Sequence, residues 1–379
     1  MKIGIDCRTI LDPKSGEVAG VGHYTYNLVS NMLDLDNKNK YVLFFDEGVG
    51  DAGNFKRKNS EIKFFSYRKY KKFLPIVYSH LLISSFVLKE KLDIFHSPAS
   101  TIPLTYNKNA IVTIHDLAIY KNPKWFPKQY FSTKVSVPKS LKKAKKIIAV
   151  SEYTKKDLMD ILKIPEDKIE VILNGIEKRE DFDKKDSADK NKIKEKFGIK
   201  QDFILFIGTL QPRKNIKGLI NAFDKLRGNR IFENYQLVIA GKSGWNYQSI
   251  FDKVREKALT KKVLFTGYIS KEDKLKLLRA TSCFCFPSFY EGFGLSILEA
   301  MQQGTPVITS NITSTKEIGG EAAIFIDPYK STSIAQALKK VLGDENLRKS
   351  FIQRGYSHVE KFSWEKCVKE TLDVYSKIK

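Results

Sequence analysis

The sequence predicts an α/β fold of two doubly wound domains, each built around a parallel sheet. Short apolar, β-branched runs alternate with helical patterns in both halves of the chain. Most of these runs are continuously hydrophobic, as expected of strands that are buried on both faces of a parallel sheet. The chain has 379 residues, more than one hydrophobic core usually organises, which favours two such domains.

The expected strands of the first half are Lys2–Ile5, Tyr41–Phe45, Ile62–Phe65, Ile94–His96, Ala110–Ile114, Lys146–Val150 and Ile169–Ile172. Those of the second half are Phe203–Ile207, Gln236–Ala240, Val263–Thr266, Cys283–Phe286, Pro306–Thr309 and Ala323–Ile326. Helical patterns include His23–Leu33, Ile216–Arg227, Lys271–Ala280, Ser333–Leu342 and Ser363–Ile378. Strand and helix alternate regularly enough to predict the same architecture twice.

The domain boundary is expected in a polar stretch after the seventh strand. Asn174-Gly175 predicts a turn, and residues 177–186 are almost wholly charged. The resulting division is a first domain over 1–172, a linker over 173–200, a second domain over 201–357 and a C-terminal segment over 358–379.

The formal net charge of +23 is unevenly distributed. Residues 51–150 hold 20 Lys and Arg against 5 Asp and Glu. Such a field attracts polyanions, either nucleic acid or anionic lipid, although a lysine-rich solvated surface is the plain alternative. The apolar run 74–88 is too short to span a bilayer, and the four cysteines show no disulfide or zinc spacing. With no visible signal peptide, we expect a cytoplasmic protein with reduced thiols.

Two glutamates, Glu291 and Glu299, flank a glycine-containing turn between an expected strand and an expected helix. Phe293 and Gly294 are expected to open that helix. The free N–H groups and partial positive charge of a helix start suit a diphosphate, whereas carboxylates accept hydrogen bonds from sugar hydroxyls. This corner therefore indicates a nucleotide-sugar site. For either glutamate alone, a solvated surface residue is the alternative.

A second candidate site follows strand Phe203–Ile207, where Gly208 leads to Arg213 and Lys214. These two cations are expected at the carboxyl edge of the sheet, where doubly wound folds bind ligands. Together they match the charge of a diphosphate, although a solvated basic loop is the alternative. Asn215 is expected to cap the helix that follows.

Two weaker candidates lie in the first domain. Gly20-Val21-Gly22, within the loop 15–24, lets the backbone approach a ligand closely after the first strand. His115 ends a buried strand, where it could contact a sugar hydroxyl or a phosphate oxygen with Asp116 helping to orient it. The ordinary alternatives are a simple turn and a structural histidine. His96, at the end of the preceding strand, is expected to be structural.

No catalytic metal site is expected. The acidic pairs Asp34/Asp36 and Asp181/Asp183 occur in polar, loop-like context rather than at strand ends. The chain also lacks the glycine-rich lysine motif of P-loop ATPases, so that class is excluded.

Together these residues resemble the retaining glycosyltransferases of family 4, which have the GT-B fold of two facing Rossmann-like domains and a C-terminal helix that crosses back to the first. The likeness rests on Glu291 to Glu299 with their Gly-Phe-Gly turn and on Arg213-Lys214, and it covers nearly the whole chain. Gly4 to Arg8, His115 to Leu117 and Gly241 to Trp245 further resemble the GDP-mannose-dependent branch.

The resemblance implies a role for each candidate residue. Arg213 and Lys214 would hold the donor diphosphate, and Glu291 and Glu299 would bind the transferred sugar and the ribose. The remaining donor contacts would come from Gly208, from the amides of Phe293, Gly294 and Leu295, from Gly20, Val21 and Gly22, and from His115. The first domain would then serve the acceptor and the second the nucleotide-sugar. No cofactor or essential metal is implied.

The expected function is transfer of a hexose, mannose in the GDP-mannose branch, to a glycan or lipid-linked acceptor in cell-surface polysaccharide synthesis. A sugar-nucleotide 2-epimerase of the same fold is the first alternative, and a non-catalytic polyanion- or membrane-binding protein is the second. For the basic region 51–150 we favour docking at the inner face of an anionic membrane over nucleic acid, because the apolar run 74–88 lies beside the charge.

Overall fold

The structure is a computed structural model that describes residues 1–13, 20–65, 76–126, 130–177, 187–229 and 233–378. It consists of two compact units, which are described separately below. Unit 1 combines Met1–Gly175 with Phe362–Lys379, and unit 2 is Ile176–Lys361. Within the described residues, no helix is long and apolar enough to cross a membrane.

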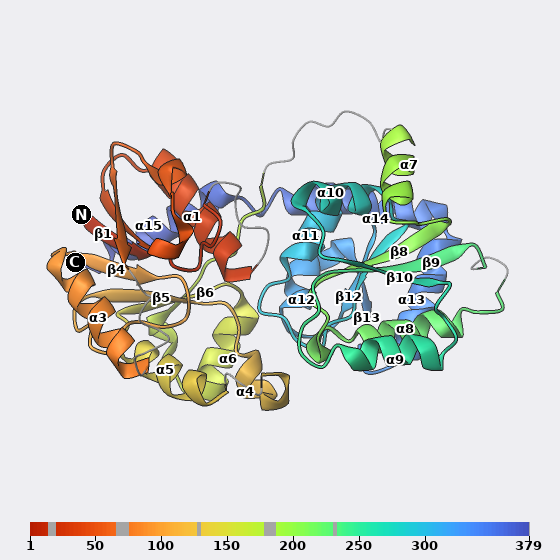
Figure 1. Ribbon diagram of the computed structural model, residues 1–379, viewed down its shortest axis with the longest axis horizontal. Coiled ribbons are helices and arrows are strands. Elements are labelled where there is room, and N and C mark those ends of the chain that lie inside the picture. The colour runs from red at the N-terminus through yellow and green to blue at the C-terminus, as the bar shows by residue number, and fades with distance from the viewer. Residues whose placement is uncertain (14–19, 66–75, 127–129, 178–186, 230–232, 379) are drawn as a thin grey trace. The chain divides into compact units, whose positions relative to one another are not determined.

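Unit 1 contains a parallel sheet with the strand order β3-β2-β1-β4-β5-β6-β7. Its strands are β1 (Lys2–Asp6), β2 (Lys40–Asp46), β3 (Ser60–Phe65), β4 (Ile94–Ser97), β5 (Ala110–Ile114), β6 (Lys146–Ala149) and β7 (Ile169–Val171). Its helices are α1 (Gly20–Leu35), α3 (Ile76–Lys89), α4 (Ala118–Lys121), α5 (Tyr130–Lys143), α6 (Glu152–Leu162) and α15 (Trp364–Ser376). Figure 1 shows them around the sheet.

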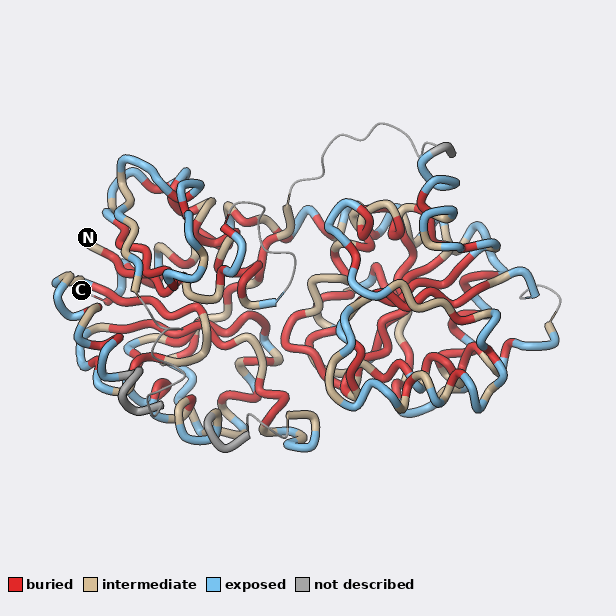
Figure 2. Tube along the Cα trace, in the orientation of Figure 1, coloured by how far each residue is buried: buried red, intermediate tan, exposed pale blue. Residues whose placement is uncertain are grey.

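Alternate residues of the unit 1 strands face two different cores. Ile3, Tyr41, Leu43 and Phe45 pack with α1 and α15 on one side, where Leu28 and Tyr375 are fully buried. Val42, Phe44 and Val112 belong to a second core that includes residues of α3, α5 and α6. This two-sided burial is the physical reason for the continuously apolar strands (Figure 2).

Unit 2 contains a second parallel sheet with the strand order β10-β9-β8-β11-β12-β13. Its strands are β8 (Asp202–Ile207), β9 (Tyr235–Ala240), β10 (Val263–Gly267), β11 (Cys283–Phe286), β12 (Val307–Ser310) and β13 (Ala323–Ile326). Its helices are α7 (Ser187–Lys196), α8 (Ile216–Lys225), α9 (Gln248–Glu256), α10 (Lys271–Ala280), α11 (Leu295–Gln302), α12 (Thr313–Gly319), α13 (Ser331–Gly343) and α14 (Glu345–Val359).

Every strand expected from the sequence is present in one of the two sheets, with its ends displaced by no more than two residues. The helix ends differ more. Helix α1 begins at Gly20 rather than at His23, and the stretch 173–200 contains helix α7, which packs on α10 inside unit 2. The charged residues 178–186 lie outside the described residues. The last helix, α15, packs against α1 within unit 1.

Candidate active site

The candidate site of unit 2 lies at the carboxyl ends of the neighbouring strands β8 and β11. The chain leaves β8 through residues 208–214 and leaves β11 through residues 287–294. Strands β9 and β10 lie on one side of this pair and β12 and β13 on the other, so the strand order reverses here. A reversal point of this kind is where doubly wound sheets bind ligands.

The loop after β8 runs alongside the loop after β9, with a parallel bridge between Leu210 and Ser243 and no space for a side chain at Gly241. Gly208 N donates to Ala240 O at 2.9 Å, and Leu210 N donates to Lys242 O at 2.9 Å. Gly241 has φ +144°, and a Cβ atom there would lie 2.1 Å from Gly208 O. These contacts hold the segment that carries Arg213 and Lys214 in one position.

Arg213, Lys214 and Glu291 form one ionic cluster. Arg213 Nη1 donates to Glu291 Oε2 at 3.0 Å and to the carbonyl of Tyr290 at 2.6 Å. Lys214 Nζ donates to Glu291 Oε1 at 2.7 Å and lies 4.8 Å from the centroid of the Phe286 ring. All three charged side chains are largely buried. Glu291 thus meets two cations that lie 77 and 78 positions earlier in the chain.

The cluster carries a net positive charge. Burial acts to raise the pKa of Glu291, but the charges of Arg213 and Lys214 outweigh it and hold the pKa below the ordinary value of 4.5. Glu291 is therefore ionised at neutral pH. One carboxylate offsets one of the two cations and fixes the positions of both, which leaves a pre-positioned positive site suited to a phosphate.

Glu299 belongs to a second, separate ion pair. It is the fifth residue of α11, and its Oε1 accepts a hydrogen bond from Lys274 Nζ of α10 at 2.5 Å. The two side chains are 13% and 9% exposed, so the pair is largely shielded from water. Lys274 was not expected from the sequence, because a lysine in the first turns of an amphipathic helix ordinarily faces solvent.

Helix α11 begins at Leu295, so the turn that precedes it is longer than expected. Phe293 and Gly294 lie just outside the helix, and Gly294 is in the left-handed conformation with φ +101°. Ser314 Oγ lies 2.8 Å from the carbonyl oxygen of Glu291 and 3.1 Å from that of Phe293. Backbone amides at the start of α11 lack intrahelical acceptors and remain candidates for an anion.

The expectation that Asn215 caps α8 is wrong. Asn215 has φ 54° and makes no side-chain capping bond. Its Nδ2 instead donates to the carbonyls of Pro287 at 3.1 Å and Pro328 at 2.7 Å. The Asn215 amide thereby joins the segment after β8 to the segments after β11 and β13. The carbonyls of Pro287 and Pro328 lie beyond the ends of the strands and need a hydrogen-bond donor from elsewhere.

His115 lies at the carboxyl end of β5 in unit 1. Its Nε2 donates to Pro98 O at 2.7 Å, and its ring packs edge-on against Tyr24 with centroids 4.8 Å apart. Burial lowers the pKa of His115, so the ring is neutral at pH 7 and Nδ1 is an acceptor. Asp116 instead accepts from Ala118 N at 3.0 Å, so the partner that orients the ring is Pro98.

His96 is structural, as expected. It is fully buried, and its ring nitrogens lie 2.6 Å from the Tyr375 hydroxyl and 2.9 Å from Thr113 Oγ1. Burial lowers its pKa to about 3. The same strand-end position therefore leads to a different environment one strand away from His115, because both ring nitrogens of His96 already have buried protein partners.

Gly20, Val21 and Gly22 form the first turn of α1 rather than a turn ahead of it. Gly20 has φ +74° and open space around its Cβ position, whereas Gly22 is buried. Residues 15–19 of the same loop lie outside the described residues, as do Asp181 and Asp183. In the other acidic pair, Asp34 binds Arg57 at 2.8 Å and Asp36 binds Tyr41.

The structure thus brings some expected site residues together and leaves others in separate places. Gly208, Arg213, Lys214, Glu291, Phe293, Gly294, Leu295 and Glu299 all follow β8 or β11 in unit 2. His115 and Gly20 to Gly22 follow strands of unit 1 at the carboxyl edge of its own sheet. Among the described residues, no group of three or more His, Cys, Asp or Glu side chains is arranged to hold a metal ion.

Comparison with known families decides what this arrangement is. The family described as "Glycosyltransferase Family 4" matches residues 18–180, and "Glycosyl transferases group 1" matches residues 188–358. The chain belongs to glycosyltransferase family 4. The glycosyltransferase has the GT-B fold that the sequence predicted, with one family match in each unit.

Relatives of this glycosyltransferase extend over most of its length. O-antigen chain mannosyltransferase B of Escherichia coli is 29% identical over 375 residues, which cover 96% of this chain and 97% of that protein. O-antigen chain mannosyltransferase RfbU of Salmonella typhimurium is 28% identical and covers 64% of this chain and 62% of its own length.

Solved structures share the fold at lower sequence identity. Anabaena HepE in complex with UDP and glucose superposes with a TM-score of 0.76 at 15% identity and covers all of both chains. WaaG, a glycosyltransferase involved in lipopolysaccharide biosynthesis, has a TM-score of 0.72 at 13% identity over 99% of each chain.

Proposed function

We propose that this glycosyltransferase transfers a hexose, mannose from GDP-mannose, to a glycan or lipid-linked acceptor during cell-surface polysaccharide synthesis. The observation that carries the proposal is the Arg213–Lys214–Glu291 cluster at the β8/β11 edge. The full-length similarity to an O-antigen mannosyltransferase supports mannose as the sugar and a polysaccharide as the product.

The cluster supports catalysis by charge stabilisation. When the bond between the anomeric carbon and the diphosphate breaks, negative charge grows on the departing phosphate oxygen. Arg213 and Lys214, already held by Glu291, interact with that charge more strongly in the transition state than in the ground state. The site is buried enough for this interaction to exceed its strength in water.

We propose that the sugar is transferred with retention at the anomeric carbon. The acceptor oxygen bonds to the face that the diphosphate leaves, and the acceptor proton passes to the departing phosphate oxygen. Both oxygens of Glu291 already accept hydrogen bonds from cations, which favours an orienting role over that of a nucleophile. Proton NMR of the first product formed distinguishes the α from the β anomer, and an inverted anomer would overturn this part.

The other polar groups are assigned to binding. Glu299 keeps acceptor capacity beyond its bond to Lys274, and it accepts hydrogen bonds from the ribose hydroxyls. The amides of Phe293, Gly294 and Leu295, with Gly208, contact the donor in unit 2. In unit 1, the Nδ1 atom of His115 accepts a hydrogen bond from a sugar hydroxyl, and Gly20 to Gly22 offer backbone amides to the phosphates.

The decisive variant is Lys214→Ala. Glu291 keeps Arg213 as its partner, so the fold is retained, while loss of one phosphate ligand raises the barrier by about 3 kcal/mol, or about a hundredfold in rate. Lys217→Ala, at an exposed position in the next helix, is the matched control and keeps full activity. GDP release from GDP-mannose measures both. Equal rates in both variants would remove Lys214 from the mechanism.

The donor is tested by ligand stabilisation. GDP and GDP-mannose are expected to raise the melting temperature more than UDP, ADP and their sugars, because a ligand that binds the folded state stabilises it in proportion to its affinity. A larger shift with UDP would change the proposed nucleobase from guanine to uracil and would leave the proposed binding site unchanged. Turnover of UDP-N-acetylglucosamine in the absence of an acceptor would instead indicate an epimerase.

We propose that no metal or organic cofactor is required, because Arg213 and Lys214 supply two protein cations that can bind the diphosphate oxygens. Activity is therefore expected to be unchanged after dialysis against EDTA. Recovery only on addition of a divalent cation would contradict this.

We also propose an anionic membrane surface as a partner of the basic region 51–150. Helix α3 of this region exposes Leu81 and Leu82 and ends at Lys89, and exposed apolar residues within a basic region suit the bilayer interface. Residues 66–75, which hold part of the charge, lie outside the described residues. Sedimentation with phosphatidylglycerol vesicles, and not with phosphatidylcholine vesicles, is expected at low salt.

A further inference from the structure

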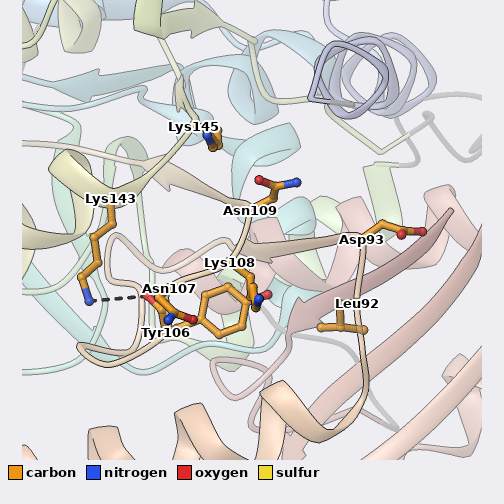
Figure 3. Close-up of a pocket in the computed structure, with 8 residues that line it drawn as sticks. All are labelled: Leu92, Asp93, Tyr106, Asn107, Lys108, Asn109, Lys143 and Lys145. Carbon is orange, nitrogen blue, oxygen red and sulfur yellow. Dashed lines mark hydrogen bonds between the residues drawn. The ribbon is translucent and has the colours of Figure 1, made fainter.

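A pocket of about 640 Å³ opens at the amino edge of the unit 1 sheet (Figure 3). Its walls are the segments that lead into three neighbouring strands: residues 92–93 before β4, residues 106–109 before β5, and Lys143 and Lys145 before β6. His115 and Gly20 follow the carboxyl ends of strands in the same sheet. The pocket therefore lies at the opposite edge of unit 1 from the residues assigned to the donor.

The pocket is positively charged. Lys108, Lys143 and Lys145 contribute three ammonium groups, and Asp93 contributes the only carboxylate among its lining residues. One oxygen of Asp93 accepts a hydrogen bond from the backbone N–H of Lys2 at 2.7 Å. Within the described part of the chain, neither the Lys108 nor the Lys145 side chain forms a hydrogen bond or an ion pair. These two cations are available to a ligand.

The floor and one wall of the pocket are held in place. Tyr106 is buried and packs against Phe95 of β4 with ring centroids 5.2 Å apart. Lys143 Nζ donates to the carbonyl of Leu104 and lies 3.5 Å from that of Tyr106, which ties α5 to the segment before β5. Burial and the charge of Lys139 lower the pKa of Lys143, so positive charge is crowded at this edge.

We propose that this pocket binds the phosphate group of a small organic phosphate. Lysine ammonium groups act as point-charge partners for phosphate, and the side-chain amides of Asn107 and Asn109 add donors at the rim. The volume lies within the range of small-molecule sites and exceeds that of a bare ion, so the ligand carries an organic part beside its phosphate. A soluble phosphate ester and a phospholipid headgroup share this chemistry.

The proposal does not depend on the assignment of the donor site. The residues that line the pocket all belong to unit 1, whereas Arg213 and Lys214 belong to unit 2. The double variant Lys108→Gln/Lys145→Gln is therefore expected to keep the fold and to release GDP from GDP-mannose at the wild-type rate.

Calorimetric titration with glycerol 1-phosphate tests the pocket. Wild-type protein and Lys214→Ala are expected to bind it equally, and Lys108→Gln/Lys145→Gln about tenfold more weakly, because two solvent-exposed charge contacts are lost. Lys56→Gln removes an exposed unit 1 lysine outside the pocket and serves as the matched control with wild-type affinity. Circular dichroism verifies that each variant is folded.

Vesicles of phosphatidylglycerol form the second arm of the test. Loss of vesicle binding by the double variant, with weak or no binding of glycerol 1-phosphate by any variant, assigns the phosphate to a lipid headgroup. Loss of glycerol 1-phosphate binding alone assigns it to a soluble ester. Equal affinity of the double variant and Lys56→Gln for both probes overturns the proposal.

Discussion

Glu291 connects two cations that the chain supplies from a single loop, and its own charge depends on them. Its folded-state pKa is lowered, so its contribution to stability is fully present above its ordinary pKa of 4.5 and is lost as the pH falls through the folded-state value. We expect the unfolding free energy of the wild type to exceed that of Glu291→Gln at pH 7, with the difference shrinking below pH 4.5. Urea titrations at several pH values measure it.

The matched control for this prediction is Glu360→Gln. Glu360 is exposed in the same unit and has no ion-pair partner among the described residues. At each pH between 3 and 7, the Glu360→Gln variant is expected to have the same unfolding free energy as the wild type. If Glu291→Gln behaves in the same way, the cluster does not support the fold.

Lys274 is the residue that pairs with Glu299 and that the sequence did not single out. Lys274→Gln leaves Glu299 as a shielded carboxylate without its cation, which is expected to destabilise the protein by about 3 kcal/mol. The double variant Lys274→Gln/Glu299→Gln is expected to recover part of that loss, because no uncompensated charge remains. Urea unfolding of the wild type, Lys274→Gln, Glu299→Gln and the double variant gives the coupling energy, and simple additivity would show that the pair is not coupled.

At the scale of elements, the carboxyl edge of the unit 2 sheet is shaped by loops that touch. Gly241 permits the close approach of the β8 and β9 loops, since a Cβ atom at this position would overlap the backbone of Gly208. The pinned β8 loop then holds Arg213 and Lys214 toward Glu291. The position of the cations therefore depends on a residue without a side chain.

Gly241→Ala is expected to cost more than about 2 kcal/mol of stability and to lower turnover, since Gly208 must move and shift the loop with it. Gly343→Ala is the control, because its Cβ would meet nothing within 4 Å. Thermal unfolding and GDP release measure the two effects. An unchanged melting temperature in Gly241→Ala would mean that the two loops adjust to the added methyl group without strain.

At the scale of the whole molecule, the chain returns to unit 1 for its last helix. Trp364, Val368 and Tyr375 of α15 are buried in the core that also contains Ile3, Ile5 and Leu28. The hydroxyl of Tyr375 also reaches His96. Unit 1 is thus completed by residues that are made after all of unit 2.

A chain that ends at residue 361 tests this dependence. Unit 1 is expected to lose amide protection along β1, β4 and β5, because one side of its core is exposed to water, whereas unit 2 keeps its protection. Hydrogen exchange followed by mass spectrometry resolves the two units. Full protection of β1 in the shortened chain would show that α15 is dispensable.

The sequence by itself determined the strands, the division into two parallel-sheet domains, the strand ends that Arg213, Lys214 and Glu291 follow, and the helix that carries Glu299. It could do so because buried parallel strands have a local signature of continuous apolar residues and because their carboxyl ends share one edge.

The tertiary structure alone decided which charges meet. Three contacts between segments far apart in the chain illustrate this. Arg213 and Lys214 bind Glu291. Glu299 binds Lys274, and Asn215 bridges strand ends instead of capping a helix. Such contacts leave no periodic pattern, because each depends on the path of a loop and on a single side chain rather than on a repeat of burial.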